Sequence, residues 1–283
     1  MFERISAGWA LTKQAANVLR LDKELLLFPI LSGIACVLVI ASFFVPMYSL
    51  GLLDSVVEDR ESTQSKVLLG VLGFLFYFIN YFIIVFFNSA LVGCAVIRLK
   101  GGDPTVGDGF ATSMSRLPQI AAWSAVAATV GMILKSFENK NNKLGQIIIG
   151  LLGTAWTILT FFVVPVIVIE KLGPIAAVKR SASLLKETWG ESLSSTFSIR
   201  LFTFLASLLG IIPMVIGGML MANGTVALGI PLFLIGILIL LGVSVISSAL
   251  NSIVLAALYI YAVEGKAPAN FDSNLVEGAF ASK

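Results

Sequence analysis

The chain has 283 residues, of which 58% are hydrophobic and only 12% are charged, and its formal net charge is +3. Soluble proteins carry about 25% charged residues, so this composition excludes a water-soluble globular fold. The sequence contains no histidine, which excludes a Ser-His-Asp triad and metal binding through imidazole. The small net charge gives no reason to expect a nucleic-acid partner.

Residues 2–20 have the pattern of an amphipathic helix. The apolar residues that share one face are Phe2, Ile5, Trp9, Ala16 and Leu19. Because a tryptophan and basic residues stand next to an apolar span, we predict a helix that lies in the membrane interface. A helix that caps a soluble domain would show the same pattern.

Six apolar segments are long enough to cross the hydrocarbon core as helices, which takes about 17–25 residues. They are Leu25–Leu50, Val67–Ile97, Leu117–Leu134, Leu144–Ile169, Leu201–Met221 and a sixth within Val226–Val263. The sixth is too long for one crossing, and we place its beginning at Gly229-Ile-Pro231. In the fourth segment, Gly145, Gly150 and Gly153 predict the close approach of a neighbouring helix.

Two further amphipathic segments follow the second and fourth spans. After the second span, Asp103 is the predicted N-cap and Pro104 the predicted first residue of a helix. After the fourth span, Gly173-Pro174 begins a helix with apolar residues at spacings of three and four. The residues of this helix that we expect to contact anionic lipid headgroups are Lys179, Arg180, Lys186 and Trp189.

The distribution of basic residues predicts the orientation of the spans. With six spans, 14 of the 19 Lys and Arg residues lie on the side that holds both termini. The positive-inside rule therefore predicts a multi-pass protein of the plasma (inner) membrane with both termini in the cytoplasm. The basic loop Lys135–Lys143 is the exception, because this arrangement places it outside.

Three consecutive parts of the chain show the order surface helix, span, span. These pseudo-repeats cover residues 1–100, 101–172 and 173–265, and related turns with Gly and Pro follow the second span of each. We predict one transmembrane domain over residues 1–265, in which a three-fold parallel repeat is one interpretation, and a polar tail over residues 266–283. Convergent apolar composition would produce a similar match.

Polar residues inside the even-numbered spans carry the candidate binding site. Asn88, Thr160 and Asn251 are predicted to lie at similar depth. They serve either as interhelical hydrogen-bonding groups, worth about 1 kcal/mol each, or as a central polar pocket for a lipid headgroup or a small solute. The apolar centres of the spans hold no Asp, Glu, Lys or Arg, which disfavours ion-coupled transport. Cys36 and Cys94 are interpreted as small buried residues, and no cofactor, metal site or catalytic residue is predicted.

Two stretches resemble known families. Gly8-Trp9 and the stretch Asp22–Pro29 resemble the beginning of DUF6159, a family of prokaryotic integral membrane proteins of unknown function. The stretch from Ala177-Val-Lys-Arg-Ser181 to Trp189-Gly190 resembles a wider set of six-span proteins, including the membrane domain of some glycerophosphodiester phosphodiesterases. Neither resemblance implies a defined activity, and the phosphodiesterase catalytic domain has no counterpart in this sequence.

The sequence therefore predicts an all-α, polytopic helical bundle with six transmembrane helices and amphipathic helices on the cytoplasmic face. We expect a non-enzymatic protein that organises the membrane or assists another membrane component. Its expected partners are membrane lipids and other membrane proteins, and the oligomeric state stays open. The alternatives are a transporter or channel for a lipid or small solute and, less favoured, an intramembrane enzyme.

Overall fold

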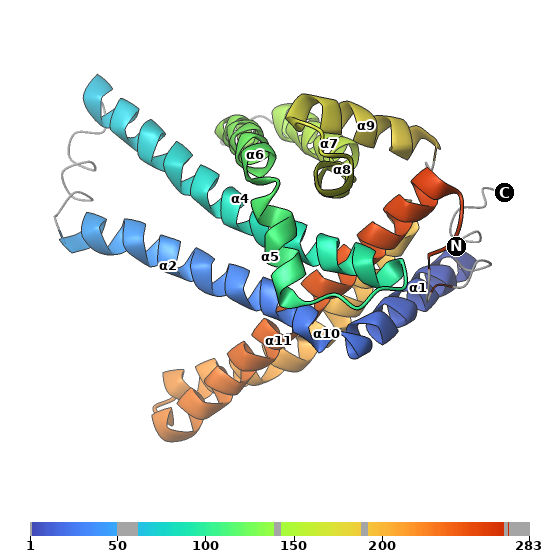
Figure 1. The fold of residues 1–283 in the computed structure, drawn as a ribbon. Helices are drawn as coiled ribbons and strands as arrows, with labels where there is room; N and C mark the ends of the chain where they lie inside the picture. Colours follow the sequence, from blue (N-terminus) through green and yellow to red (C-terminus); the bar gives the residue numbers. More distant parts are fainter. Residues whose placement is uncertain (1, 50–61, 139–142, 188–191, 269–270, 272–283) are drawn as a thin grey trace. The chain divides into compact units, whose positions relative to one another are not determined.

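The computed structural model describes residues 2–49, 62–138, 143–187, 192–268 and 271, and the described part is helical with no strand. The longer helices are α1 (Phe2–Leu21), α2 (Leu27–Ser49), α4 (Thr63–Leu99), α6 (Leu117–Glu138), α7 (Lys143–Leu159), α10 (Ser192–Ala222) and α11 (Val226–Glu264). The shorter ones are η1 (Lys23–Leu26), α5 (Val106–Met114), α8 (Val163–Glu170) and α9 (Pro174–Glu187). Six stretches within them are long and apolar enough to cross a membrane, which confirms the predicted all-helical class with six spans (Figure 1).

The chain forms two compact units. The first comprises Met1–Pro29, Cys94–Thr105 and Lys186–Lys283, and the second comprises Ile30–Gly93 and Val106–Leu185. Each unit is described by itself below.

In the first unit, α10 and α11 pack as an antiparallel hairpin (Figure 1). Glycines of both helices lie in the contact between them. A Cβ atom added to Gly217 would lie 2.5 Å from the backbone nitrogen of Phe233 and 2.7 Å from the carbonyl oxygen of Gly229. A Cβ atom added to Gly236 would lie 2.6 Å from the carbonyl oxygen of Gly210. The two backbones are therefore in direct contact, which only glycine allows.

The glycines of this hairpin follow a shared register. Gly210 and Gly217 are seven residues apart on α10, and Gly229 and Gly236 are seven apart on α11. Seven residues are close to two helical turns, so both glycines of each helix face the partner helix. Farther along the hairpin, the Thr203 hydroxyl donates a 2.8 Å hydrogen bond to the Ser247 hydroxyl, which adds a polar contact between the helices.

The expectation of close helix packing in the fourth span is wrong at Gly150 and Gly153. A Cβ atom at either position would meet no atom within 4 Å, so neither glycine contacts a neighbouring helix there; the surroundings of Gly145 lie outside the described set. Close approach requires glycines in register on two helices, and the described chain meets this condition between α10 and α11.

Helix α1 packs on the α10–α11 hairpin with a face that only partly overlaps the predicted one: of the predicted residues, Leu19 is buried and Ala16 is half-buried, and the side chains of Phe2 and Ile5 lie outside the described set. Leu11, Ala15 and Val18 are fully buried, whereas Trp9 is 53% exposed. The residues of α1 that pack on the hairpin are small or aliphatic. The side of α1 that carries Trp9 and Lys13 faces away from this contact.

Helix α11 is one continuous helix of 39 residues, so no break marks the predicted beginning at Gly229-Ile-Pro231. At 1.5 Å per residue its length is about 58 Å, roughly twice the hydrocarbon core of a bilayer. Its first half exposes Leu228 and Leu238, each by about two thirds, while most residues from Ala249 to Ile260 are buried. The excess length of the sixth span therefore packs against protein.

In the second unit, the fourth span is broken into α7 and α8 at residues 160–162. Pro165 explains the break, because it has no N–H for the carbonyl of Phe161 and its ring would clash with that carbonyl in a continuous helix. The released backbone N–H of Phe162 donates a buried 3.0 Å hydrogen bond to the hydroxyl of Ser181 in α9. A side chain 19 residues downstream thus satisfies the group that the break exposes.

Helix α5 docks on α4 but begins later than predicted. Its first residue is Val106, so the assignment of Asp103 as N-cap and Pro104 as first helical residue is wrong; the Asp103 carboxylate pairs with an arginine instead. The Phe110 ring lies 6.2 Å from that of Phe86, and the Ser113 hydroxyl donates a 2.7 Å hydrogen bond to the Phe86 carbonyl.

Three of the span helices end in the same local conformation. A residue with a left-handed backbone follows each helix: Gly101, the second residue after α4, at φ +86°; Lys171, directly after α8, at +61°; and Gly265, directly after α11, at +65°. A proline follows three positions later in each case, as Pro104, Pro174 and Pro268. The resemblance between these turns thus extends to backbone conformation, and the three-fold repeat itself stays a prediction.

Candidate functional site

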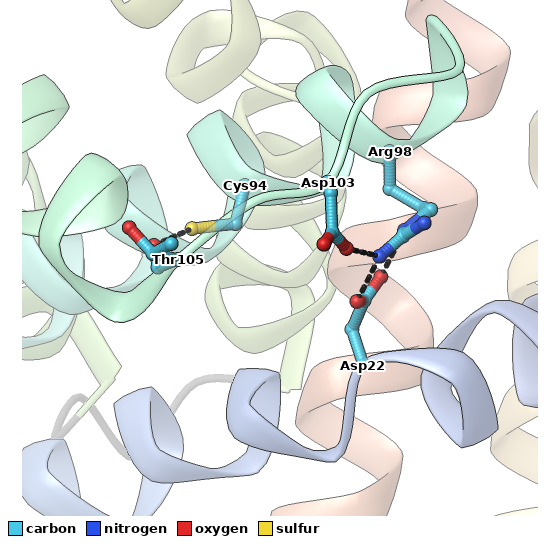
Figure 2. Close-up of polar contacts among 5 residues, drawn as sticks. All are labelled: Asp22, Cys94, Arg98, Asp103 and Thr105. Carbon is cyan, nitrogen blue, oxygen red and sulfur yellow. Dashed lines mark hydrogen bonds and ion pairs between the residues drawn. The ribbon is translucent and has the colours of Figure 1, made fainter.

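The end of α4 in the first unit carries a cluster of charges that we call the Arg98 junction, formed by Asp22, Arg98 and Asp103 (Figure 2). The Nε and Nη2 groups of Arg98 donate to the two carboxylate oxygens of Asp22, and Nη2 also donates to Asp103 Oδ1. The planar guanidinium matches a carboxylate in this two-point geometry. One side chain therefore connects the corner after α1, the end of α4 and the following loop.

The two carboxylates of the junction differ in their surroundings. The Asp22 side chain is 8% exposed and that of Arg98 is 18% exposed, whereas the Asp103 side chain is 92% exposed. A buried charge is tolerated only with a partner, so the pair of Asp22 with Arg98 is obligatory. The Asp103 carboxylate is in water, so its ion pair with Arg98 contributes little to the stability of the fold.

Local backbone geometry places these side chains. After α4, the N–H groups of Gly101 and Gly102 donate to the carbonyls of Arg98 and Ile97, the pattern of a helix end closed by a left-handed glycine. The Cys94 thiol then donates to the carbonyl of Thr105 over 3.4 Å (Figure 2). These bonds hold the loop along the end of α4 and bring Asp103 to Arg98.

The two other helices whose left-handed residue is followed three positions later by a proline also carry ion pairs. At the end of α8, Glu170 accepts from Arg180 Nε in α9 at 3.0 Å. At the end of α11, Glu264 lies 3.0 Å from Lys100 Nζ, in the loop after α4. The carboxylates at the ends of these helices are thus engaged in contacts between segments. Chemically, the clusters can hold segments together and present fixed charge at the ends of apolar spans.

The geometry of the charged helix ends does not show which proteins this chain is related to, and a comparison with protein families does. The sequence pattern of a family described as a family of unknown function, DUF6159, matches residues 67–269. This match covers most of the chain. The chain belongs to the DUF6159 family. A search of curated proteins found no match.

The matched part of this DUF6159 protein includes charged residues at the helix ends but none of the residues on which the DUF6159 resemblance was based. Arg98, Glu170 and Glu264 lie within it, whereas Gly8-Trp9 and Asp22 lie before it. The description of DUF6159 gives no activity. The resemblance to the membrane domain of glycerophosphodiester phosphodiesterases stays a resemblance.

The predicted central polar residues occupy different settings in this DUF6159 protein. Asn88 is half-buried in α4, Thr160 lies at the break between α7 and α8, and Asn251 is exposed on α11. Thr160 donates its hydroxyl hydrogen bond to the carbonyl of Trp156, within its own helix. Asn88 and Thr160 belong to the second unit, where no hydrogen bond links their side chains, and Asn251 belongs to the first.

The turns give a measure of depth for these three residues. Asn88 lies 13 residues before Gly101, Thr160 11 residues before Lys171, and Asn251 14 residues before Gly265. A spread of three residues is about 4.5 Å along a helix and rotates the side chain by most of a turn. A shared central pocket stays a prediction.

The predicted headgroup contacts in α9 divide into two groups. Lys179 and Lys186 are exposed, while Arg180 is partly buried in its ion pair with Glu170. Trp189 lies outside the described residues. Ile175, which the sequence places on the apolar face, is 73% exposed, because Ala177, Ser181 and Leu184 form the buried face.

Arg98 directly follows the predicted second span, which ends at Ile97, but sequence reasoning did not find its partner. Asp22 was noted only within a family resemblance. A signal did exist, because an acidic residue between two apolar helices must find a cation when it is buried. The choice among the available cations depends on the tertiary fold, since Asp22 and Arg98 are 76 positions apart.

Proposed function

We propose that this protein is a non-enzymatic, multi-pass component of the plasma membrane that organises lipids or assists another membrane protein. The observation that carries the proposal is the use of charge at the helix ends. Asp22, Glu170 and Glu264 each pair with a cation from a different segment. Carboxylates held in such pairs connect segments, which fits a structural role at the membrane surface better than acid–base catalysis.

The orientation with both termini in the cytoplasm is part of this proposal. After Cys36 and Cys94 are replaced by alanine, single cysteines at the exposed positions Asn17 and Lys179 should react with a membrane-impermeant maleimide only in permeabilised cells. A cysteine at the exposed position Gln64, at the beginning of α4, should react in intact cells. Labelling of Asn17→Cys and Lys179→Cys on opposite sides would overturn the arrangement.

A carrier for a lipid or small solute is the alternative function, with Asn88, Thr160 and Asn251 along its path. Our proposal predicts no saturable flux when the purified chain is reconstituted in liposomes with candidate solutes or fluorescent phospholipids. Flux that is lost in Asn88→Leu with Asn251→Leu, while the helical content is unchanged, would replace our proposal with the carrier. Labelling by a serine-reactive probe would favour an intramembrane enzyme.

A further inference from the structure

Three arginines in the described part of the chain have partly buried side chains, and they differ in their partners. Arg98 pairs with Asp22, and Arg180 pairs with Glu170. The guanidinium of Arg116 makes two hydrogen bonds, both to backbone carbonyls, and meets no carboxylate among the described residues. A charge that is partly removed from water is costly without a counter-charge. Arg116 therefore carries a positive charge that the described chain does not pair.

Backbone carbonyls hold this guanidinium in a fixed position within the second unit. Nε of Arg116 donates to the carbonyl oxygen of Val168 at 3.3 Å, and Nη1 donates to that of Ser115 at 3.0 Å. Val168 lies in the last turn of α8, and the C-terminal end of a helix carries about half a negative charge, which offsets the guanidinium only in part. Nη2 donates to no described residue, so its two N–H groups are available to an external anion.

Arg116 lies where two spans end. It directly precedes the candidate span Leu117–Phe137, and the carbonyl that its Nε contacts belongs to the last turn of the candidate span that ends at Glu170. Its sequence neighbours Met114 and Leu117 are 62% and 39% exposed. Because the ends of membrane-spanning helices lie at the level of the lipid headgroups, the anion that surrounds this guanidinium is lipid phosphate.

The first turn of α6 adds further hydrogen-bonding groups next to Arg116. The N–H groups of Leu117 and Gln119 have no acceptor among the described residues, because the first hydrogen bond at this helix end is donated by Ile120. The side-chain oxygen Oε1 of Gln119 is buried and accepts no hydrogen bond from a described residue. A buried acceptor without a donor is costly, and a hydroxyl of a bound molecule would be that donor.

We propose that Arg116, Leu117 and Gln119, which we call the Arg116 site, bind the headgroup of one anionic phospholipid that carries a hydroxyl, as phosphatidylglycerol does. The phosphate accepts from Nη2 of Arg116 and from the N–H groups of the first turn of α6. A headgroup hydroxyl donates to Oε1 of Gln119. The acyl chains lie along the exposed side chains of Met114 and Leu117. The guanidinium favours an anionic headgroup over a zwitterionic one.

This inference rests on the proposed function and deepens it, because a protein that organises lipid needs a selective contact with it. The two fail separately. Saturable flux in liposomes would overturn the proposed function and leave the Arg116 site intact. Equal binding of anionic and zwitterionic lipids would overturn the Arg116 site and leave the ion pairs at the helix ends unaffected.

The first test is native mass spectrometry of the full chain from detergent with phosphatidylglycerol and phosphatidylcholine in equal amounts. The wild type should retain one phosphatidylglycerol in preference. Arg116→Gln should lower this preference about fivefold, as expected for the loss of one basic group near the membrane surface. Arg116→Lys keeps the positive charge, and lysine also binds phosphate, so its preference should stay within about twofold of the wild type.

Gln119→Leu distinguishes lipid binding from a structural role of this side chain. The change removes a buried acceptor that has no donor, so resistance to unfolding in sodium dodecyl sulfate should be unchanged or higher. Retention of phosphatidylglycerol should fall about two- to tenfold, the effect of one hydrogen bond. Unchanged retention would contradict the contact with a headgroup hydroxyl.

Arg20→Gln is the matched control for the loss of charge. It removes an exposed arginine of α1 that lies outside the Arg116 site, and it should leave the preference for phosphatidylglycerol unchanged. An equal loss of preference in Arg20→Gln and Arg116→Gln, or no loss in either variant, would overturn the proposal.

A second measurement uses the wild-type chain and does not depend on the folding of variants. Phenylglyoxal modifies arginine side chains, and peptide mass spectrometry reports the modification at each arginine of the protein in nanodiscs. Replacement of phosphatidylcholine by phosphatidylglycerol should protect Arg116 more than Arg20, and inorganic phosphate added to phosphatidylcholine nanodiscs should protect neither. Equal protection of Arg116 by inorganic phosphate would show a site for a free anion, and no protection by phosphatidylglycerol would refute the site.

Discussion

Gly217→Leu is expected to separate α10 from α11 and to lower the free energy of unfolding by at least about 3 kcal/mol. A Cβ atom at this position would lie 2.5 Å from the backbone nitrogen of Phe233, so no change of side-chain rotamer relieves the clash. Overpacking against side chains costs about 1–3 kcal/mol, and more where the backbone must move. Unfolding in sodium dodecyl sulfate, followed by far-UV circular dichroism, measures the difference.

The neighbouring residue provides the control for this change. Gly218 is on the same helix, and a Cβ atom there would meet nothing within 4 Å. Gly218→Leu should therefore leave the unfolding midpoint unchanged or raise it slightly, because leucine forms helix more readily than glycine. Equal stability of the two variants would show that the α10–α11 contact is looser than described.

Arg98→Leu is expected to cost about 3–5 kcal/mol, because it leaves the carboxylate of Asp22 without its cation while only 8% exposed. Asp103→Asn should cost less than about 1 kcal/mol, since that contact is in water. The same unfolding measurement compares both variants with the wild type.

A double-mutant cycle separates the loss of the pair from the loss of arginine packing. Asp22→Asn removes the stranded charge, so adding it to Arg98→Leu should recover stability instead of lowering it further. A simple sum of the two single-variant costs would mean that the side chains act independently, which would contradict the geometry of the Arg98 junction.

The spans could be predicted from the sequence because their signal is local. A run of apolar residues such as Val67–Ile97 identifies its own helix, and the structure extends α4 by only a few residues at each end. The break in the fourth span has a local cause as well, Pro165, but its hydrogen-bonding partner Ser181 belongs to another helix. The sequence alone therefore explains why the helix breaks near Pro165. It does not identify the hydrogen bond to Ser181 that compensates for the break.

Pairings between segments were much harder to predict. Glycines in the fourth span and in α10 look alike in sequence, yet Gly150 faces open space while Gly217 touches a backbone. Whether a glycine contacts a second backbone depends on whether the neighbouring helix has glycines at the same level along its axis. In the same way, the buried face of α1 is determined by the hairpin that it contacts, and the partner of Asp22 is determined by where the fold places the end of α4.

The packing of α1 on α10 and α11 has a consequence for biosynthesis. About 240 residues must be translated after α1 before both partner helices are complete, which takes roughly 12–50 s at about 5–20 residues per second. During that interval α1 has no protein surface to cover Leu11, Ala15 and Val18, so the nascent chain must shelter them in the lipid headgroup region or on a chaperone. Helix α1 is therefore made before the helices on which it packs and can assemble only after them.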